Sequence, residues 1–121
     1  MNIDEFNKKF LLPSFLIAEF TYWRYSLRPR QCTLGAGVIS LRRECENFSG
    51  LRAEEAAELS RVFNVVETTL KKSFNYDKIN YLALMLYDAH VHYHVVPRYS
   101  TSKTIAGYEW KDPTWPTGLP D

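Results

Sequence analysis

The sequence predicts an α+β domain in which an antiparallel sheet carries one long helix on one face. Three segments lead to this prediction. Apolar residues recur at helical steps between Ala53 and Phe74, residues 78–87 are almost continuously apolar, and residues 90–97 alternate as a strand does. With 121 residues, 45% of them hydrophobic, the chain is long enough to form one domain with a core of its own.

The elements before the long helix are expected to be short. Residues 1–14 predict a short helix or turn that ends near Pro13, and the aromatic-rich segment Phe15–Leu27 predicts a strand. A turn is expected at residues 28–31, where two arginines flank a proline. A second strand is expected at Val38–Leu41, entered through a glycine-rich turn.

The long helix is predicted over residues 53–74. Acidic residues in its first turn and lysines in its last turn complement the helix dipole, and Asn75 is expected to be the C-cap. The N-cap position is occupied by Arg52, where Ser, Thr or Asp is preferred. The apolar stripe that should face the sheet consists of Ala56, Leu59, Phe63, Val66, Leu70 and Phe74.

Two strands are expected after the helix. The apolar segment Lys78–Tyr87 predicts a central strand that is covered on both faces. A tight turn at Asp88 and Ala89 should lead into the histidine-containing strand, and Pro97 is expected to end that strand.

The last part of the chain changes in composition. Residues 100–121 are rich in Trp, Pro, Gly and Asp, and we expect an ordered but irregular tail because tryptophan side chains are costly to leave in water. The sequence contains no repeats or linkers. We therefore expect a single domain over residues 1–121 with a core of about residues 15–100.

Charge and cysteine content limit the possible partners and location. Fifteen basic and fourteen acidic residues give a net charge of +1, so no global field favours nucleic acid or a membrane as partner. Cys32 and Cys45 are expected to be free thiols in a reducing cytoplasm. The apolar segment Phe10–Ala18 is too short to span a bilayer, is interrupted by Pro13, and is expected to be part of the fold.

All three histidines of the chain lie within five residues, at His90, His92 and His94. Successive side chains of a strand point to opposite faces, so the three imidazoles should share one face, with Tyr93 on the other. Neighbouring imidazoles disfavour each other's protonation and need polar partners when they are buried. A strand that gives one face to three such rings is expected to serve chemistry.

Three interpretations of these histidines are open. A metal site would use two adjacent histidines and a carboxylate, because His90 and His94 lie about 13 Å apart on a strand and both cannot reach one Zn²⁺. A cluster without function is the second interpretation. The third is nucleophilic catalysis, in which one ring nitrogen is fixed by a hydrogen bond and the other attacks phosphorus. The third interpretation needs no metal or other cofactor, and any Mg²⁺ would arrive with the substrate.

The histidine segment, His90-Val-His-Tyr-His-Val-Val-Pro, resembles the H-φ-H-φ-H-φ-φ signature of the histidine triad (HIT) family. The resemblance covers about residues 15–116 and is closest to the bacterial branch described as diadenosine tetraphosphate hydrolase-like. Further segments that support it are Asn80-Tyr81-Leu82, Pro97-Arg98-Tyr99, and Phe48-Ser49-Gly50-Leu51 with Glu54-Glu55.

The resemblance implies a fold, an activity and an assembly. The sheet would extend across a two-fold homodimer, and the protein would bind a nucleotide or dinucleoside polyphosphate. It would act as a nucleotidyl hydrolase or transferase on a nucleoside phosphate ester, anhydride or phosphoramidate. His92 would be the nucleophile that forms a nucleotidyl-histidine intermediate, and His90 and His94 would hold the phosphate and orient His92.

Two arginines are candidates for substrate binding. Arg98 follows the triad strand directly, and guanidinium groups match phosphate oxygens. Arg28, in the turn after the first strand, aligns near the position that contacts the ribose in the family.

The chain also departs from the family pattern. Ala36 stands where many members carry a fourth histidine, Leu86 stands where a glutamine is common, and a basic segment that often ends in histidine reads Arg42-Arg43-Glu44. These changes leave the nucleophile in place but affect phosphate positioning and help to the leaving group. The alternative function is therefore a nucleotide-binding HIT-like protein with weak or lost catalysis.

Overall fold

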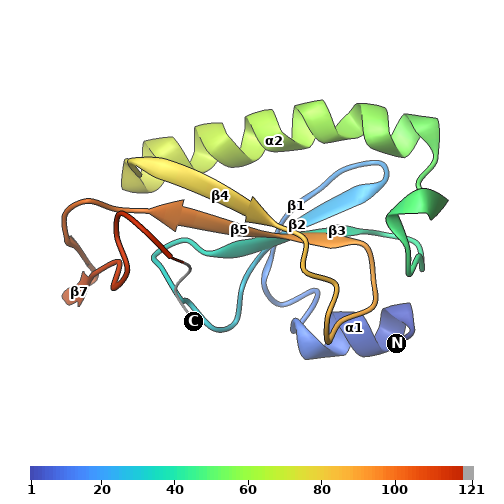
Figure 1. The fold of residues 1–121 in the computed structure, drawn as a ribbon, viewed down its shortest axis with the longest axis horizontal. Helices are drawn as coiled ribbons and strands as arrows, with labels where there is room; N and C mark the ends of the chain where they lie inside the picture. The colour runs from blue at the N-terminus through green and yellow to red at the C-terminus, as the bar shows by residue number, and fades with distance from the viewer. Residues whose placement is uncertain (119–121) are drawn as a thin grey trace.

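The computed structural model describes residues 1–118 and has the α+β architecture that the sequence predicts. A five-stranded antiparallel sheet has the strand order β1-β2-β3-β5-β4. The long helix α2 lies across one face of the sheet and the short helix α1 lies on the other (Figure 1). The elements are α1 (Ile3–Lys9), β1 (Leu16–Glu19), β2 (Trp23–Leu27), β3 (Gly37–Leu41), the 3₁₀ turn η1 (Phe48–Gly50), α2 (Ala53–Phe74), β4 (Lys78–Leu82), β5 (His92–Arg98), β6 (Lys103–Ile105) and β7 (Tyr108–Trp110). Within residues 1–118, no helix is both long enough and apolar enough to cross a membrane.

Helix α2 has the bounds that the sequence predicts, and Asn75 ends it in the left-handed conformation with φ of 49°. The predicted stripe is wrong at its first position, since Ala56 is exposed and Glu55 is buried in its place. Glu55 is buried because its carboxylate accepts hydrogen bonds from the Arg43 side chain and from the Arg52 backbone N–H. The helix start is therefore stabilised by its third residue rather than by the N-cap side chain.

The segment Phe15–Leu27 forms two strands instead of the single strand predicted. β1 and β2 pair as an antiparallel hairpin whose turn holds Thr21 and Tyr22. Both of these residues donate their backbone N–H to the Glu58 carboxylate of α2, at 3.2 and 2.8 Å. A charged residue that lies 36 positions away along the chain thus fixes the turn, which local pattern alone does not reveal.

The prediction of a central strand over Lys78–Tyr87 is wrong in length and in position. β4 ends at Leu82 and lies at the edge of the sheet, next to β5 alone among the described strands. The histidine-containing strand takes the place between β3 and β4. The rest of the apolar segment is a loop that leaves Leu86 and Tyr87 76% and 90% exposed.

β5 continues through Pro97 to Arg98, although Pro97 was expected to end it. Pro97 pairs with Ile79 of β4. β3 pairs with β5 only as far as Val95, so the missing N–H of Pro97 breaks no bond to β3.

The tail contains a two-stranded sheet of β6 and β7, which the composition did not predict. Its two-residue turn is formed by Ala106 and Gly107, both with positive φ, as the tightest hairpin turns require. Residues 119–121 of the predicted tail lie outside the described residues.

Candidate active site

Strand β5 places His92 and His94 on the sheet face that α1 covers, as the alternation predicts. Their rings lie edge to face with centroids 5.0 Å apart. Tyr93 and Val95 point the other way, into the core beneath α2. His90 lies two residues before the start of the strand, in the segment that leads into it.

Backbone carbonyl groups hold two of the three rings in a fixed orientation. His90 Nε2 is 2.8 Å from the carbonyl oxygen of Leu41, and a neutral His90 donates its hydrogen there. His92 Nδ1 contacts the carbonyl oxygen of His90 in the same way. Because Nδ1 of a neutral His92 carries the hydrogen in this contact, Nε2 is left with its lone pair free. Nε2 is therefore the ring nitrogen of the middle histidine that can act as an acceptor.

Burial lowers the pKa of all three histidines. His90 and His92 are almost fully buried, and loss of hydration disfavours their charged forms. The pKa of His94 is lowered to about 4, first by burial and then by the proximity of the His92 ring and of Arg28. All three imidazoles are thus neutral at pH 7, which is the state that nucleophilic attack requires.

We expect this burial to make stability depend on pH. The unfolded chain takes up protons near the ordinary histidine pKa of about 6.5, whereas folded His94 does so near pH 4. Stability should therefore be full above pH 6.5 and decrease as the pH falls toward 4, with His94 contributing a loss of up to roughly 2 kcal/mol at pH 5. Urea unfolding at pH 7, 6 and 5, with NMR titration of the His94 ring, measures both quantities. A folded-state titration of His94 near pH 6.5 would contradict this expectation.

Helix α1 covers the triad with two aromatic side chains that the sequence analysis did not single out. Phe6 is fully buried, and its ring centroid lies 4.7 Å from that of His90 and 5.2 Å from that of His92. Phe10 lies 6.1 Å from His92 and 6.2 Å from His94 by the same measure. The available signal was the four-residue spacing of these two phenylalanines, which puts them on one face of a helix.

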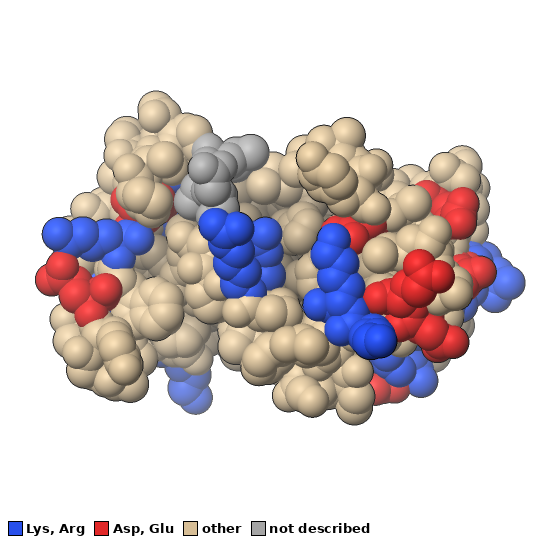
Figure 2. Space-filling model, turned by 90° about the horizontal axis from the view of Figure 1, so that it is seen from below, with Lys and Arg blue, Asp and Glu red and all other residues tan. Residues whose placement is uncertain are grey.

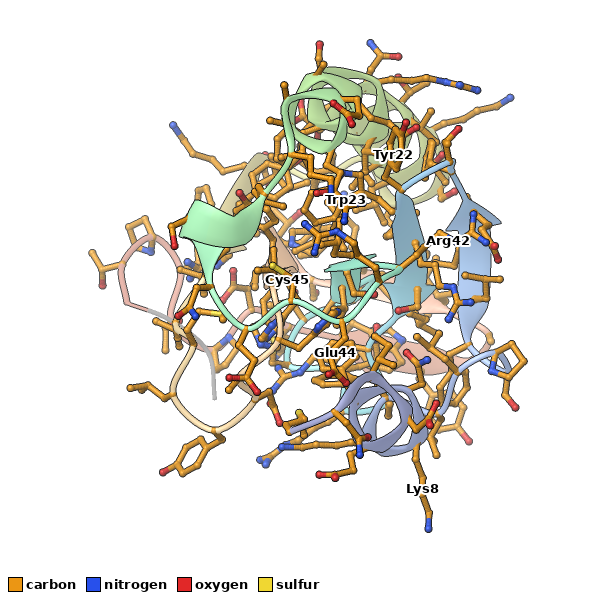
Figure 3. All side chains as sticks on the ribbon, turned by 90° about the vertical axis from the view of Figure 1, so that its right-hand side faces the viewer. Lys8, Tyr22, Trp23, Arg42, Glu44 and Cys45 are labelled. Atoms are coloured by element: carbon orange, nitrogen blue, oxygen red, sulfur yellow. The ribbon has the colours of Figure 1, made fainter. Side chains whose placement is uncertain are left out.

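Each end of α1 is attached to the segments that border the triad. The backbone N–H of Ile3 donates to the Glu44 carboxylate at 2.8 Å, and Figure 3 shows Glu44 beside this helix. At the other end, Lys9 forms an ion pair with Asp88 at 2.6 Å. The expected tight turn at Asp88 thus also anchors the helix over the site.

A hollow of about 350 Å³ opens beside His94. Lys9, Arg28 and Arg30 line it with positive charge, and Asp88 is the acidic residue among its lining side chains. Figure 2 looks at this face of the molecule and shows basic side chains across its middle. The structure therefore brings Arg28 to the triad, together with Lys9 and Arg30, which sequence reasoning missed.

Arg98 is not brought to this hollow. It lies four residues beyond His94 on β5, about 13 Å along the strand. Its guanidinium is buried and forms an ion pair with Asp112 at 2.6 Å. Further acceptors are Asn80 Oδ1, Thr114 Oγ1 and the carbonyl oxygens of Thr117 and Gly118. Arg98 fastens the C-terminal segment to the sheet, and this use of its donors argues against the predicted phosphate contact.

The departures from the family pattern can also be located. Ala36 is fully buried at the entry to β3, and Leu86 is exposed in the loop before the triad.

Across residues 1–118, no three His, Cys, Asp or Glu side chains are grouped so that they could hold a metal ion.

The geometry defines a class of protein: a small α+β domain with a histidine triad presented on one sheet face. The HIT domain family matches residues 36–101, which include β3, α2 and the whole triad. The chain therefore belongs to the HIT domain family.

Solved structures agree with this assignment at the level of the fold. A histidine triad protein from Sinorhizobium meliloti is 21% identical, with a TM-score of 0.70, and the match covers 98% of this chain and 78% of that one. A HIT family member from Bacillus subtilis is 21% identical, with a TM-score of 0.65 and coverage of 74% and 67%. The diadenosine triphosphate hydrolase of Plasmodium falciparum is 15% identical, with a TM-score of 0.67 and coverage of 73% and 63%.

The chain spans 60–67% of the length of several of these structures. The comparison with curated proteins returned no match.

Proposed function

We propose that this protein is a nucleotidyl hydrolase or transferase that uses His92 as a covalent nucleophile. The observation that carries the proposal is the contact between His92 Nδ1 and the His90 carbonyl group, which leaves Nε2 as the free nitrogen. Membership in the HIT domain family supports it, and so does the fold shared with a diadenosine triphosphate hydrolase. The substrate class proposed is a nucleoside phosphate ester, anhydride or phosphoramidate, with dinucleoside polyphosphates as the first candidates.

The reaction requires two displacements at one phosphorus atom. The lone pair of His92 Nε2 forms a bond to the phosphorus, and the bond to the leaving group breaks and gives that group its electron pair. A polyphosphate leaving group departs as an anion and needs no proton. Water then attacks the phosphorus, the P–N bond returns its electrons to Nε2, and the proton from water passes to solvent. The product is a nucleoside monophosphate, and His92 is again neutral.

The surroundings of His92 suit the charge that develops on the phosphate. His94 lies next to His92 on the same face and is neutral, so it donates a hydrogen bond without repelling a cationic neighbour. Lys9, Arg28 and Arg30 line the adjacent hollow, where they attract the phosphate chain of a substrate. We propose these three side chains, with His90 as the orienting residue, as the substrate-binding set.

The alternative is a nucleotide-binding HIT protein with weak or lost catalysis. Ala36 and Leu86 favour it, because a histidine and a glutamine are common at these positions in the family. Incubation with a dinucleoside polyphosphate that carries ³²P in its α-phosphates separates the two. The hydrolase proposal expects a covalently labelled protein that the His92→Asn variant does not form. Equilibrium binding without any covalent label in the wild type would favour the alternative.

We also propose a homodimer. β4 has an unpaired edge within the described residues, and Leu84, Leu86 and Tyr87 are exposed directly after it. Light scattering at micromolar concentration should give the mass of two chains, and Leu86→Glu should lower it toward that of one. Tyr108→Ser is the matched control, because Tyr108 is 72% exposed on the separate β6-β7 hairpin. A wild-type monomer across this concentration range would contradict the proposal.

Catalysis is expected to need no metal held by the protein. Dialysis against a chelator should leave the fold and nucleotide binding unchanged, and should leave hydrolysis intact on a substrate that itself needs no Mg²⁺. The His92 mechanism would be overturned if the protein bound a stoichiometric transition metal, lost activity when the metal was removed, and regained activity when the metal was added back.

Both cysteines are free thiols, and we propose a cytoplasmic location on this basis.

A further inference from the structure

A second hollow, of about 380 Å³, lies at the end of the sheet where the β1-β2 turn, the residues after β3 and the start of α2 meet. Four guanidinium groups line this arginine hollow, together with Tyr22 and Glu55; they belong to Arg24, Arg42, Arg43 and Arg52. Figure 3 labels Tyr22 and Arg42 in this region, both on the side of α1 that faces α2. The arginine hollow shares no lining residue with the hollow beside His94.

The acidic residues near the arginine hollow already accept hydrogen bonds from the protein itself. The Glu55 carboxylate accepts two hydrogen bonds from the Arg43 side chain, at 2.7 and 2.8 Å, and a third from the Arg52 backbone. Burial would raise the pKa of Glu55, but these bonds, above all those from Arg43, outweigh it and lower the pKa, so Glu55 remains ionised and neutralised. Glu58 accepts the two backbone N–H groups of the β1-β2 turn.

Two of the arginines keep donors without acceptors. Arg24 Nε is buried and has no hydrogen-bond partner within residues 1–118. The carboxylate nearest to it is that of Glu19, at 3.7 Å, and Glu19 also pairs with Arg42 at 2.8 Å. The exposed Arg52 forms no ion pair in the part of the chain that the structure describes. No side-chain hydrogen bond of Arg24 or Arg52 is found within residues 1–118, and an oxyanion in the hollow that both residues line would give their guanidinium groups an acceptor.

We propose that the arginine hollow binds a small organic phosphate monoester, at a site separate from the triad. The planar guanidinium fork matches phosphate oxygens, and four guanidiniums against three carboxylates leave an excess of positive charge. The volume of the hollow is in the range of small-ligand sites and exceeds what a lone phosphate ion fills. The organic part of the ligand would lie against Tyr22.

NMR titration of ¹⁵N-labelled protein with phenyl phosphate tests the proposal, with inorganic phosphate and phenol as comparison ligands. We expect saturable shifts in residues 21–24, 42–43 and 52–55, with phenyl phosphate binding more tightly than inorganic phosphate and phenol not binding. Shifts confined to Arg28, Arg30 and the triad would overturn the proposal, as would no saturation up to millimolar ligand. Equal affinities for phenyl phosphate and inorganic phosphate would overturn the monoester assignment.

Variants then locate the contacts. Arg24→Gln and Arg52→Gln should each weaken phenyl phosphate binding about tenfold, the usual effect of losing one charge-assisted hydrogen bond. Arg52 is exposed, so its variant serves even if Arg24→Gln unfolds the protein. Lys72→Gln is the charge-matched control, because Lys72 lies twenty residues further along α2, roughly 30 Å away. His92→Asn should keep the affinity unchanged, which separates this site from the proposed active site. Unchanged affinity in both arginine variants would refute the proposal.

Discussion

The His92→Asn variant should lose turnover by at least about 10³-fold while it keeps its fold, because the proposed reaction has no path without a nucleophile. The asparagine side-chain amide is similar in size to the Cγ and Nδ1 part of the imidazole ring. Its NH₂ group can still donate a hydrogen bond to the His90 carbonyl oxygen. Single-turnover hydrolysis of a dinucleoside polyphosphate measures the rate, and circular dichroism verifies the fold. A rate near that of the wild type would remove His92 from the mechanism.

The flanking histidine gives the matched comparison. His94→Asn removes a ring from the same face, but in the proposed mechanism it removes a hydrogen-bond donor and not the nucleophile. The expected loss is about 10²- to 10³-fold. The covalent label should still form on the His94→Asn variant and be absent from His92→Asn. This difference in labelling distinguishes the two roles even if the two losses in rate turn out to be similar.

The Arg98→Met variant should be the most destabilised of the single substitutions considered for this chain. Its partner Asp112 has a fully buried carboxylate. Burial would raise the pKa of Asp112, but hydrogen bonds from Arg98 and from two backbone N–H groups outweigh this and lower it. Without Arg98 a charge is left buried and unpaired, and such a change typically costs about 3–5 kcal/mol. Urea unfolding at pH 7 measures the loss.

Two further variants make the Arg98 experiment specific. Arg98→Met combined with Asp112→Asn should recover much of the stability, because asparagine removes the unpaired buried charge and keeps an oxygen that can accept a hydrogen bond from the backbone N–H of Tyr99 or Thr114. Lys111→Met is the control for an exposed ion pair, because Lys111 and Glu109 are both exposed and lie 3.4 Å apart. This substitution should change the free energy of unfolding by less than about 1 kcal/mol. If Arg98→Met is as stable as Lys111→Met, Arg98 does not anchor the tail as the structure indicates.

Local patterns predicted the elements that are stabilised by their own sequence. α2 has the predicted bounds because its periodicity, charged ends and Asn75 all act within the helix. The shared face of His92 and His94 follows from strand geometry alone. Both features can be predicted without knowing what the helix or the strand packs against.

The errors concern features that depend on distant partners. The apolar segment after Leu82 was expected to be buried, yet the strand order places β4 at the edge and leaves Leu86 exposed. Arg98 follows the triad in sequence, but Asp112 lies close enough in space to take its charge. The contact of Phe6 with the triad joins residues more than eighty positions apart. Such contacts depend on the topology of the fold, which the local patterns of a single sequence do not specify.

The short helix over the triad has a consequence for how members of the family diverge. Seven residues are too few to form a stable helix in isolation, so α1 owes its order to the surfaces that it touches, the imidazole rings among them. The part of the chain that matches the family begins at residue 36 and leaves this helix out. A member of the family could therefore retain an identical triad beneath a different covering segment. In the proposed mechanism, such a change would alter access to His92, and with it the size of substrate admitted, without any substitution in the three histidines.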